Sequence, residues 1–452
     1  MKTELLVIGA QAAGMSAASR AKRQQKDLDV LVLEKSSYVS YGACGLPYYI
    51  GDLVKSMEGL VVHDAAFFKE KRGIPIWTRH EALQIDPKRK KVTARSLDEG
   101  KDKEIEYEKL VIGTGSQAAV PPIEGIDYPH VYTLKTIEDG MRIKGFIEEE
   151  KPEQAVIIGA GLIGLEMAEA FAARGLKVTI LKRPGSILKM LDESMTVPVQ
   201  EELTKQGVEL CLDAEIQKIK GDQKSVAAVS CSGRDYPADM VLLATGMKPR
   251  SDLAQAAGLS IGPFKEIEVD ERMQTSDPYI WAAGDCVGQF HRISQEKVYM
   301  PRGTTSNKQG RIAGENAVGG SDSFAGIMGT AVVKVFDLEV AATGLNEKAA
   351  QRAGFAFNSV EITHSSHAHT YPNPHPEPIT VRLLVEQKTG RLLGAQMVGK
   401  MGVAKRIDVL AAALSASMTV FEISQLDLSY APPYSPVYDA ILIAANAAKK
   451  KV

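Results

Sequence analysis

Short runs of apolar residues, each ending in glycine, recur along this chain. Residues 5–9 read Leu-Leu-Val-Ile-Gly and residues 155–159 read Ala-Val-Ile-Ile-Gly, about 150 positions apart. Each run resembles a buried strand and leads through small residues into a helical pattern. A second apolar run follows each helical pattern, at Val30–Leu33 and at Val178–Leu181. The pattern predicts two βαβ units, and so an internal duplication.

The glycine turns of the two units predict nucleotide binding. Residues 159–164 read Gly-Ala-Gly-Leu-Ile-Gly, a complete GxGxxG, whereas residues 9–14 carry Gln11 in place of the middle glycine. In such turns the first glycine permits the tight turn, the second lets a pyrophosphate approach the backbone, and the third lets helix and strand pack closely. The phosphate then lies at the N-terminus of the helix. We expect Gln11 to shift the first pyrophosphate slightly.

The residue that ends each second strand indicates which nucleotide is bound. Glu34 lies 25 positions after Gly9, close to the usual spacing for a carboxylate that binds ribose hydroxyls. The matching positions of the second unit hold Lys182 and Arg183. A carboxylate there would repel a 2′-phosphate, whereas two cations would attract it. The pair favours NADPH over NADH, and the alternative without a ligand is two solvated charges at a strand end.

Further strands indicate that the second unit is inserted in the first. Residues 110–115 and 241–246 are apolar runs that end in Thr-Gly and precede a proline, as expected for crossings between two domains. Residues 275–286 form another strand, which ends in Gly284-Asp285, and an Asp at this place can bind a sugar hydroxyl. The first unit therefore resumes after the second.

The last part of the chain, residues 325–452, has no dinucleotide-binding pattern. It mixes apolar strand-like runs with helical patterns near 404–416 and 439–448. The expected strands are Ala331–Phe336, Ile379–Val385 and Leu392–Val398. This mixture predicts a third domain of the α+β type.

Composition excludes several classes of protein. Lysine and arginine total 54 against 56 acidic residues, and a formal charge of −2 argues against bulk binding to nucleic acid or a membrane surface. No apolar run approaches the roughly 18 residues of a membrane helix, and the N-terminus lacks the layout of a signal peptide. Four cysteines in 452 residues cannot form a dense disulfide framework. We therefore expect a cytoplasmic protein.

Cys44 is the candidate reactive residue. It lies ten residues after Glu34, within Ser-Tyr-Gly-Ala-Cys-Gly-Leu-Pro-Tyr-Tyr-Ile-Gly at residues 40–51, and no second cysteine lies within five positions. A cysteine that opens a helix has its pKa lowered by the helix dipole. The other cysteines are expected to be buried small apolar residues. They are Cys211, Cys231 and Cys286.

The order of these motifs resembles that of the flavin-dependent pyridine nucleotide-disulfide oxidoreductases. The similarity spans essentially the whole chain. It includes residues 275–285, 303–311, 343–347, 405–408 and 430–434. The resemblance implies an α/β fold with two Rossmann-like dinucleotide-binding domains, the second inserted in the first, and a C-terminal α+β dimerisation domain. The expected boundaries are 1–116 with 247–324 for the FAD domain, 117–246 for the NAD(P)H domain and 325–452 for the dimerisation domain.

The segment around Cys44 resembles the single-cysteine branch of this family. That branch includes coenzyme A-disulfide reductases, persulfide reductases, NADH oxidases and NADH peroxidases. The oxidases and peroxidases carry a catalytic histidine in the first glycine loop, where this chain has Ala12. The resemblance therefore favours reduction of coenzyme A disulfide, or of a coenzyme A-linked persulfide or polysulfide, through a mixed disulfide between Cys44 and coenzyme A. A water-forming NADH oxidase and a redox-sensing flavoprotein are the alternatives.

The resemblance also implies which residues form the sites, in a homodimer whose subunits share them. Catalysis would involve Cys44 together with Tyr371 and Tyr430, which the family places opposite the partner's cysteine. Tyr434, which ends the 430–434 motif, is a further candidate, ranked below Tyr430. FAD and NAD(P)H would be bound by Gly9, Ala12, Gly14, Glu34, Lys35, Ser40, Thr114, Gly115, Gly159, Gly161, Gly164, Glu166, Lys182, Arg183, Gly246, Gly284 and Asp285. Coenzyme A would be bound by Arg20, Arg23, Ser40 and Lys71, and the alternative for Arg20 and Arg23 is a solvated basic helix end.

Two other features of the sequence concern a metal site and a further domain. Four histidines at positions 364, 367, 369 and 375 suggest a metal site, but the prolines between them predict an extended loop. We expect no metal there, and a loop that lines the partner's active site instead. The run Lys449–Lys451 is typical of a solvated tail, so we expect no fused rhodanese domain.

Overall fold

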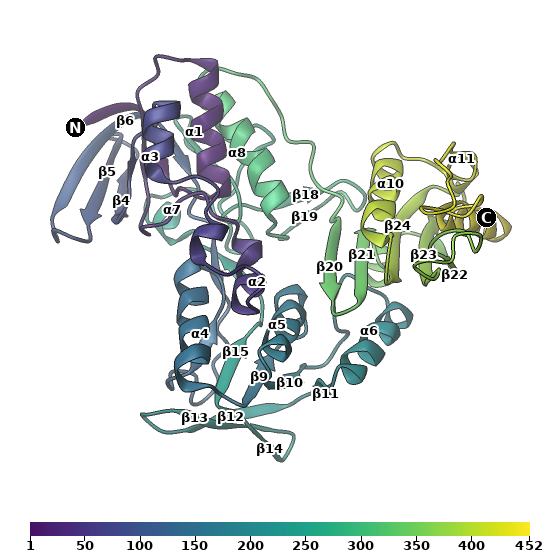
Figure 1. Ribbon diagram of the computed structural model, residues 1–452. Coiled ribbons are helices and arrows are strands. Elements are labelled where there is room, and N and C mark those ends of the chain that lie inside the picture. The colour runs from purple at the N-terminus through teal and green to yellow at the C-terminus, as the bar shows by residue number, and fades with distance from the viewer.

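The computed structural model describes all 452 residues, and its largest sheet contains the first βαβ unit (Figure 1). The strand order is β3-β2-β1-β6-β5-β4, and β17 also pairs with β6. The strands are β1 (Lys2–Ile8), β2 (Val30–Leu33), β3 (Ile76–Trp77), β4 (His80–Asp86), β5 (Lys91–Ser96), β6 (Asp102–Ile112) and β17 (Ile280–Ala282). β17 pairs parallel to the end of β6, so the chain returns to this sheet after the second unit.

Two helices that are far apart in sequence pack side by side on this sheet (Figure 1). They are α1 (Ala12–Gln24) and α8 (Gly303–Ala317). A Cβ atom at Gly310 would lie 2.2 Å from the carbonyl oxygen of Ala13, and one at Gly314 would lie 2.1 Å from that of Ala17. Glycine at these two positions therefore lets the helix backbones touch. Shorter helices α3 (Ala65–Arg72) and α7 (Asp252–Ala256) complete this part.

The second βαβ unit forms a separate, wholly parallel sheet. Its order is β11-β10-β9-β15-β8. The strands are β8 (Val131–Thr133), β9 (Gln154–Ile158), β10 (Lys177–Leu181), β11 (Glu209–Cys211) and β15 (Met240–Leu243), and the helices are α4 (Ile137–Glu150), α5 (Leu162–Ala173) and α6 (Glu193–Lys205). A small antiparallel sheet of β12 (Ile216–Gly221), β13 (Val226–Cys231) and β14 (Arg234–Pro237) lies beside it. The chain enters and leaves through β7 (Ser116–Ala118) and β16 (Met247–Pro249), which pair antiparallel, so the two expected crossings lie side by side.

The C-terminal part is an antiparallel sheet with helices, as the sequence predicts. Its order is β20-β21-β24-β23-β22. The strands are β20 (Ala331–Val335), β21 (Leu338–Gly344), β22 (Phe357–Ser365), β23 (Pro378–Glu386) and β24 (Leu392–Gly399), and the helices are α9 (Glu347–Arg352), α10 (Val403–Ser415), α11 (Val420–Ile423) and α12 (Ala440–Ala448). A hairpin of β18 (Gln289–His291) and β19 (Glu296–Val298) precedes it. No helix of the structure has both the length and the apolar character needed to cross a membrane.

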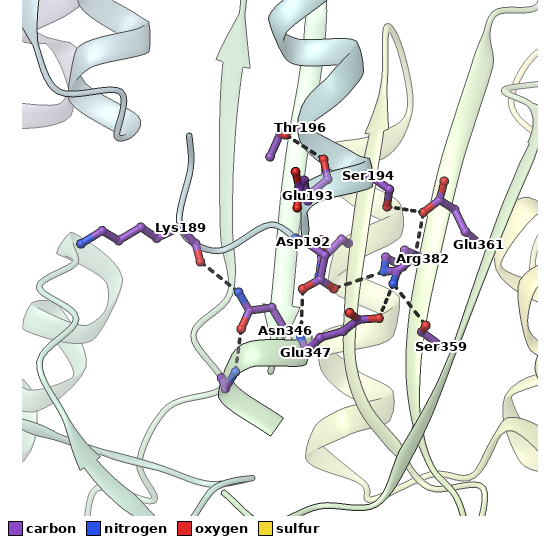
Figure 2. A network of polar contacts seen from close by, with 12 residues as sticks. Lys189, Asp192, Glu193, Ser194, Thr196, Asn346, Glu347, Ser359, Glu361 and Arg382 are labelled. Carbon is purple, nitrogen blue, oxygen red and sulfur yellow. Dashed lines mark hydrogen bonds and ion pairs between the residues drawn. The ribbon is translucent and has the colours of Figure 1, made fainter. Parts of the chain in front are cut away.

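A buried polar network joins the second unit to the C-terminal sheet (Figure 2). Asp192 is the residue before α6, and its carboxylate accepts hydrogen bonds from Arg382 Nε at 3.2 Å and from Gln396 Nε2 at 2.7 Å. The Arg382 guanidinium also contacts Glu347 and, at 2.9 Å, Glu361. Its side chain is only 15% exposed, so this cation is neutralised by acids from both parts of the molecule rather than by water.

Candidate active site

The glycine turns have the geometry that a dinucleotide needs. Gly9 and Gly159 have φ of +100° and +118°, and a Cβ at either would lie 2.3 Å from a carbonyl oxygen of the opposite strand end. Gly161 differs, because no atom lies within 4 Å of its Cβ position. The fold of the chain itself therefore does not require glycine at position 161, and the absence of a side chain there leaves open space at the N-terminus of α5. That space suits a phosphate group held by the free N–H groups of the helix.

Gln11 does not disturb the first turn. It caps α1 with φ −102° and ψ −159°, whereas Gly161 caps α5 with φ −89° and ψ −172°, so the two backbones have the same extended form. The Gln11 side chain donates a hydrogen bond from Nε2 to the carbonyl oxygen of Tyr38 at 3.2 Å. The main chain of the first turn therefore matches the complete motif despite the substitution.

Glu34 lies beside the first turn. Its Oε2 accepts a hydrogen bond from the N–H of Ala10 at 2.7 Å, and its Oε1 accepts one from the N–H of Ser36 at 2.9 Å. Burial raises the pKa of Glu34, and these hydrogen bonds act in the opposite direction. Lys35 instead points to β4, where it forms an exposed ion pair of 2.7 Å with Glu81.

Asp285 is the centre of a polar cluster at the end of β17. Its carboxylate accepts hydrogen bonds from Lys135 Nζ at 2.9 Å, Ser116 Oγ at 2.9 Å and Ser306 Oγ at 3.0 Å. Burial alone would raise the pKa of Asp285, but the Lys135 charge and the hydrogen bonds hold it below its usual value. Gly284, the residue before it, has φ +89°. An ionised acid fixed at a strand end is suited to bind sugar hydroxyls.

Three further predicted positions lie where the chain crosses between the units. Thr114 Oγ1 donates to the carbonyl oxygen of Arg250 at 2.6 Å. Gly115 and Gly246 have φ of +72° and +114°, and no atom lies near their Cβ positions. These glycines therefore shape the crossings and leave space beside them.

The Cys44 segment is wedged between the two nucleotide-binding units (Figure 1). A 3₁₀ turn at Ala43–Gly45 leads into α2 (Leu46–Ile50), which packs against α4 and α5. A Cβ at Gly140 of α4 would lie 2.8 Å from Leu46 Cδ2, so the second unit contacts α2 closely. Buried apolar side chains of α2 join the core of the second unit, and this fixes Cys44 at the boundary.

The expected lowering of the Cys44 pKa is wrong for the protein chain. Cys44 is an exposed residue with a free thiol. Partial burial of its sulfur raises the pKa, the charges of Glu166 and Asp285 raise it further, and the charge of Lys135 lowers it. The main physical reason is burial of the sulfur, and α2, which has only five residues and begins after Cys44, supplies little helix dipole to offset it.

Glu166 is a second titratable group of this site. It lies on α5, and burial together with the charge of Glu169 raises its pKa to about 7. Its charge in turn acts on Cys44 and on Tyr48. Among the other cysteines, Cys231 and Cys286 are buried as expected, whereas Cys211 is only partly buried because β11 is an edge strand.

The structure separates the two cations after β10. Lys182 is buried and its Nζ donates to the carbonyl oxygen of Arg183, so it stabilises its own loop. Burial, followed by the charges of Lys189 and Arg183, lowers the pKa of Lys182. Arg183 is exposed and has no acidic partner. Of the predicted pair, only Arg183 presents a free charge to a ligand.

Four arginines from three helices lie near the C-terminal end of α1, namely Arg20, Arg23, Arg72 and Arg311. Burial and the charges of Arg311, Arg72 and Arg20 lower the pKa of Arg23. Arg20 is neutralised by Glu315 at 2.6 Å, but the other three have no carboxylate partner. Sequence reasoning selected Arg20 and Arg23 and missed Arg311, which reaches this place only because α8 packs on α1. The predicted Lys71 is exposed on α3, the helix that also carries Arg72.

Two polar contacts lie nearer the glycine loop. One joins the predicted Ser40 to the first glycine turn, and the other joins α1 to α8. Ser40 has φ +48°, and its N–H donates to the carbonyl oxygen of Ala10 at 2.9 Å. Ser16 Oγ donates to Asn307 Oδ1 at 2.7 Å across the two helices. Sequence reasoning missed Ser16 and Asn307, because their contact depends on helices far apart in the chain.

The three predicted tyrosines lie on two loops of the C-terminal part. Tyr371, Tyr430 and Tyr434 are 40%, 49% and 78% exposed. Both loops are bound to Arg406 of α10, whereas α2, which follows Cys44, packs against α4 and α5. A single chain therefore does not unite the tyrosines with its own cysteine. His367 is buried beneath its loop, with Nε2 at 3.1 Å and 3.0 Å from the carbonyl oxygens of Tyr371 and Pro374, so it stabilises the loop.

The comparison with protein families agrees with this geometry. Residues 3–310 match the model of the pyridine nucleotide-disulphide oxidoreductases, and residues 330–440 match that of the dimerisation domain of the same group. The chain belongs to the pyridine nucleotide-disulphide oxidoreductase family. It is therefore a flavin-dependent oxidoreductase that uses FAD and a pyridine nucleotide, and its C-terminal part is a dimerisation domain.

Individual relatives narrow the comparison. The chain is 37% identical to an NAD(P)H coenzyme A polysulfide/persulfide reductase of Pyrococcus horikoshii, over 99% of both chains. It is 36% identical to a protein of Methanocaldococcus jannaschii named NADH oxidase, again over 99% of both. Among solved structures, an NAD-dependent persulfide reductase of A. fulgidus is 43% identical with a TM-score of 0.96, over 100% of this chain and 83% of that one.

Proposed function

We propose that this enzyme uses NADPH or NADH to reduce coenzyme A disulfide or a coenzyme A-linked persulfide or polysulfide. The main supporting observation concerns the two ends of α1. The segment that carries the exposed thiol of Cys44 is bound to the glycine loop before this helix, and an arginine cluster lies at the C-terminal end. The helix places its glycine loop beside the Cys44 segment and Arg23 roughly 17 Å further along. A substrate with sulfur at one end and phosphates at the other suits this layout.

Each step uses groups that the chain provides. When bound, FAD relays two electrons from the nicotinamide to a disulfide. The Cys44 thiolate attacks one sulfur of coenzyme A disulfide, so that a Cys44–coenzyme A disulfide forms and one coenzyme A thiolate leaves. Two electrons then break the mixed disulfide, which restores the Cys44 thiolate and releases the second coenzyme A thiolate. The sum is one NADPH and one proton consumed for two coenzyme A thiols.

The protein would bind the nucleotides through its glycine turns and strand-end acids. Asp285 and Glu34 are placed for sugar hydroxyls of FAD, and the open space at Gly161 is placed for the pyrophosphate of NAD(P)H. The exposed guanidinium of Arg183 favours NADPH. We assign residues 1–116 with 247–324 to the FAD domain, 117–246 to the NAD(P)H domain and 325–452 to the dimer, and we place the reaction in the cytoplasm.

The match to the dimerisation domain supports a homodimer. We infer that its active sites are shared, because Tyr371, Tyr430 and Tyr434 are exposed on that domain and separated from Cys44 of the same chain. A phenol from the partner would then donate a hydrogen bond to the leaving coenzyme A thiolate, and a positioned donor of this kind contributes a few kcal/mol.

One experiment tests the proposal directly. Cys44→Ser should keep bound FAD and still accept hydride from NADPH, yet lose reduction of coenzyme A disulfide by several orders of magnitude. Intact mass spectrometry of the wild type, before and after a reductant, should show a coenzyme A adduct that the variant lacks. Turnover of coenzyme A disulfide by Cys44→Ser at the wild-type rate would exclude the mechanism.

An NADH oxidase is the second candidate, because one relative of 36% identity has that name. Ala12 stands where the family's oxidases carry a histidine, which disfavours this function. Oxygen uptake with NADH alone distinguishes the two candidates. Uptake faster than coenzyme A disulfide reduction would favour the oxidase.

A further inference from the structure

A single arginine of the C-terminal domain holds both tyrosine loops. Arg406 lies on α10, and its Nη2 donates to the carbonyl oxygen of Ser366 at 2.8 Å and to that of Tyr434 at 3.1 Å. Ser366 begins the loop that carries Tyr371, and Tyr434 lies in the loop that also carries Tyr430. Two segments about 70 residues apart in sequence are therefore joined through one guanidinium.

The two loops also contact each other directly. The N–H of Ala368 donates to the carbonyl oxygen of Pro432 at 3.1 Å. Ser366 Oγ lies 3.0 Å from His367 Nδ1, and the other nitrogen of that ring faces two carbonyl oxygens of the same loop. The loops therefore form one connected unit, in which displacement of the first moves the second.

Asp439 fixes the orientation of Arg406. Its Oδ2 accepts from Arg406 Nε at 2.7 Å and from Ser435 Oγ at 3.0 Å, while its Oδ1 caps α12 through the N–H of Ile441 at 2.9 Å. The side chains of Arg406 and Asp439 are 11% and 8% exposed. A buried ion pair of this kind fixes the orientation of both side chains, because each charge is held by the other and by its hydrogen bonds.

A guanidinium is suited to bind both loops at the same time. It carries five N–H donors in a rigid planar fork, whereas the ammonium of lysine is a compact charge on a flexible stem. The Arg406 guanidinium donates hydrogen bonds to Asp439, to the two loop carbonyl oxygens and, at 3.1 Å, to the carbonyl oxygen of Gly402. Lysine would retain the ion pair and lose the simultaneous hold on both loops.

We propose that Arg406, oriented by Asp439, is a positioning residue that presents Tyr371 and Tyr430 to the Cys44 site of the partner subunit. The inference rests on the proposed function, because it takes the tyrosines as partners of that cysteine. Arg406 acts through the two loops, whose carbonyl oxygens it binds. Its effect is confined to the disulfide step, since hydride transfer to FAD uses groups of the other two domains.

The first test separates the two half-reactions in the full-length dimer with bound FAD. For Arg406→Met, the rate of anaerobic flavin reduction by NADPH should stay within twofold of the wild type. Reoxidation of the reduced enzyme by coenzyme A disulfide should fall at least tenfold, and Arg406→Lys should recover only part of it. Arg391→Met is the matched control, because Arg391 pairs with Glu386 in the same domain and contacts neither loop. It should leave both rates unchanged.

The second test uses mixed dimers and excludes simple damage to the fold. A dimer of one Cys44→Ser chain and one Arg406→Met chain contains one site with an intact cysteine and intact partner loops, so it should regain about half of the wild-type activity. A dimer of one wild-type chain and one chain with both substitutions contains no such site, so its activity should not exceed that of the Arg406→Met homodimer. Absence of recovery in the first dimer, with its formation shown by two affinity tags, would overturn the inference. So would a wild-type disulfide step in Arg406→Met.

These outcomes are distinct from failure of the proposed function. If Cys44→Ser homodimers reduce coenzyme A disulfide at the wild-type rate, the proposed mechanism through Cys44 fails irrespective of Arg406. If Cys44→Ser is inactive and Tyr430→Phe is impaired while Arg406→Met reacts normally, only the positioning role is wrong.

Discussion

Lys135 Nζ lies 2.9 Å from Asp285 Oδ2, so a cation of the second nucleotide-binding unit is held against the acid that follows β17 of the first. Both charges act on Cys44, because Lys135 lowers the pKa of the thiol and Asp285 raises it. Glu166 of α5 raises it as well. The reactivity of Cys44 therefore depends on three residues from both units, which come together only where the units meet.

The first prediction concerns the pH dependence of this thiol. The pKa of Glu166 is about 7, so the carboxylate becomes charged between about pH 6 and pH 8 and then opposes ionisation of Cys44. Glu166→Gln removes this charge and should lower the pKa of Cys44. Lys135→Met removes a favourable charge and should raise it. Rates of Cys44 alkylation by iodoacetamide across pH 5–10 measure both, and shifts in the same direction for the two variants would contradict the assignment.

The second prediction separates the two cations after β10. Arg183→Ala should reduce the kcat/KM with NADPH about tenfold and leave that with NADH nearly unchanged, because a hydrogen bond to a charged group contributes roughly 1.5–3 kcal/mol. Lys182→Met should affect both cofactors equally, since its Nζ binds the main chain of its own loop. Kinetics with both cofactors test this, and an NADPH-specific loss in Lys182→Met alone would reverse the roles.

Sequence patterns predicted the elements that are buried on all sides. β2 occupies Val30–Leu33 as expected, because four consecutive apolar residues suit a strand covered on both faces. β22 escaped prediction, because Phe357–Ser365 is an edge strand with one fully buried residue and no apolar run. β21 was also missed, since its helix-compatible residues Leu338–Gly344 become a strand only by pairing with β20 and β24.

The environment of the site depended on contacts that the sequence does not reveal. Cys44 is conspicuous by its neighbours, but its pKa is raised by burial and by the charge of Glu166 and lowered by Lys135, and both of these residues lie more than 90 positions away. Arg311 approaches Arg23 only because Gly310 and Gly314 let α8 lie against α1. Lys182 and Arg183 look equivalent in sequence, and only the course of the loop buries one and exposes the other.

The third prediction concerns the network of Figure 2. Arg382 faces Asp192, Glu347 and Glu361, and its side chain is 15% exposed. Arg382→Met leaves the buried carboxylate of Asp192 without its cation, and removal of one partner from a buried pair costs about 3–5 kcal/mol. The free energy of unfolding in urea should fall by about this amount.

The matched control for this prediction is an exposed pair. Arg95→Met disrupts the ion pair with Asp102, in which both side chains are more than 40% exposed. Such pairs contribute about 0–1 kcal/mol, so the free energy of unfolding should barely change. Equal losses in Arg382→Met and Arg95→Met would show that the buried network adds no stability.

The last prediction tests the arginine cluster as the site for the coenzyme A phosphates. Arg311 is exposed, lacks a carboxylate partner and lies close enough to Arg23 to lower the pKa of that guanidinium. Mutual repulsion of unpaired cations is relieved when an anion binds between them, so Arg311→Met should raise the KM for coenzyme A disulfide about tenfold and leave kcat nearly unchanged.

The KM should also rise with ionic strength in the wild type and less steeply in the variant. Pantethine, a disulfide of the same arm without the nucleotide phosphates, provides the control, since its KM should not respond to Arg311→Met. An equal loss with both disulfides would place the phosphates elsewhere.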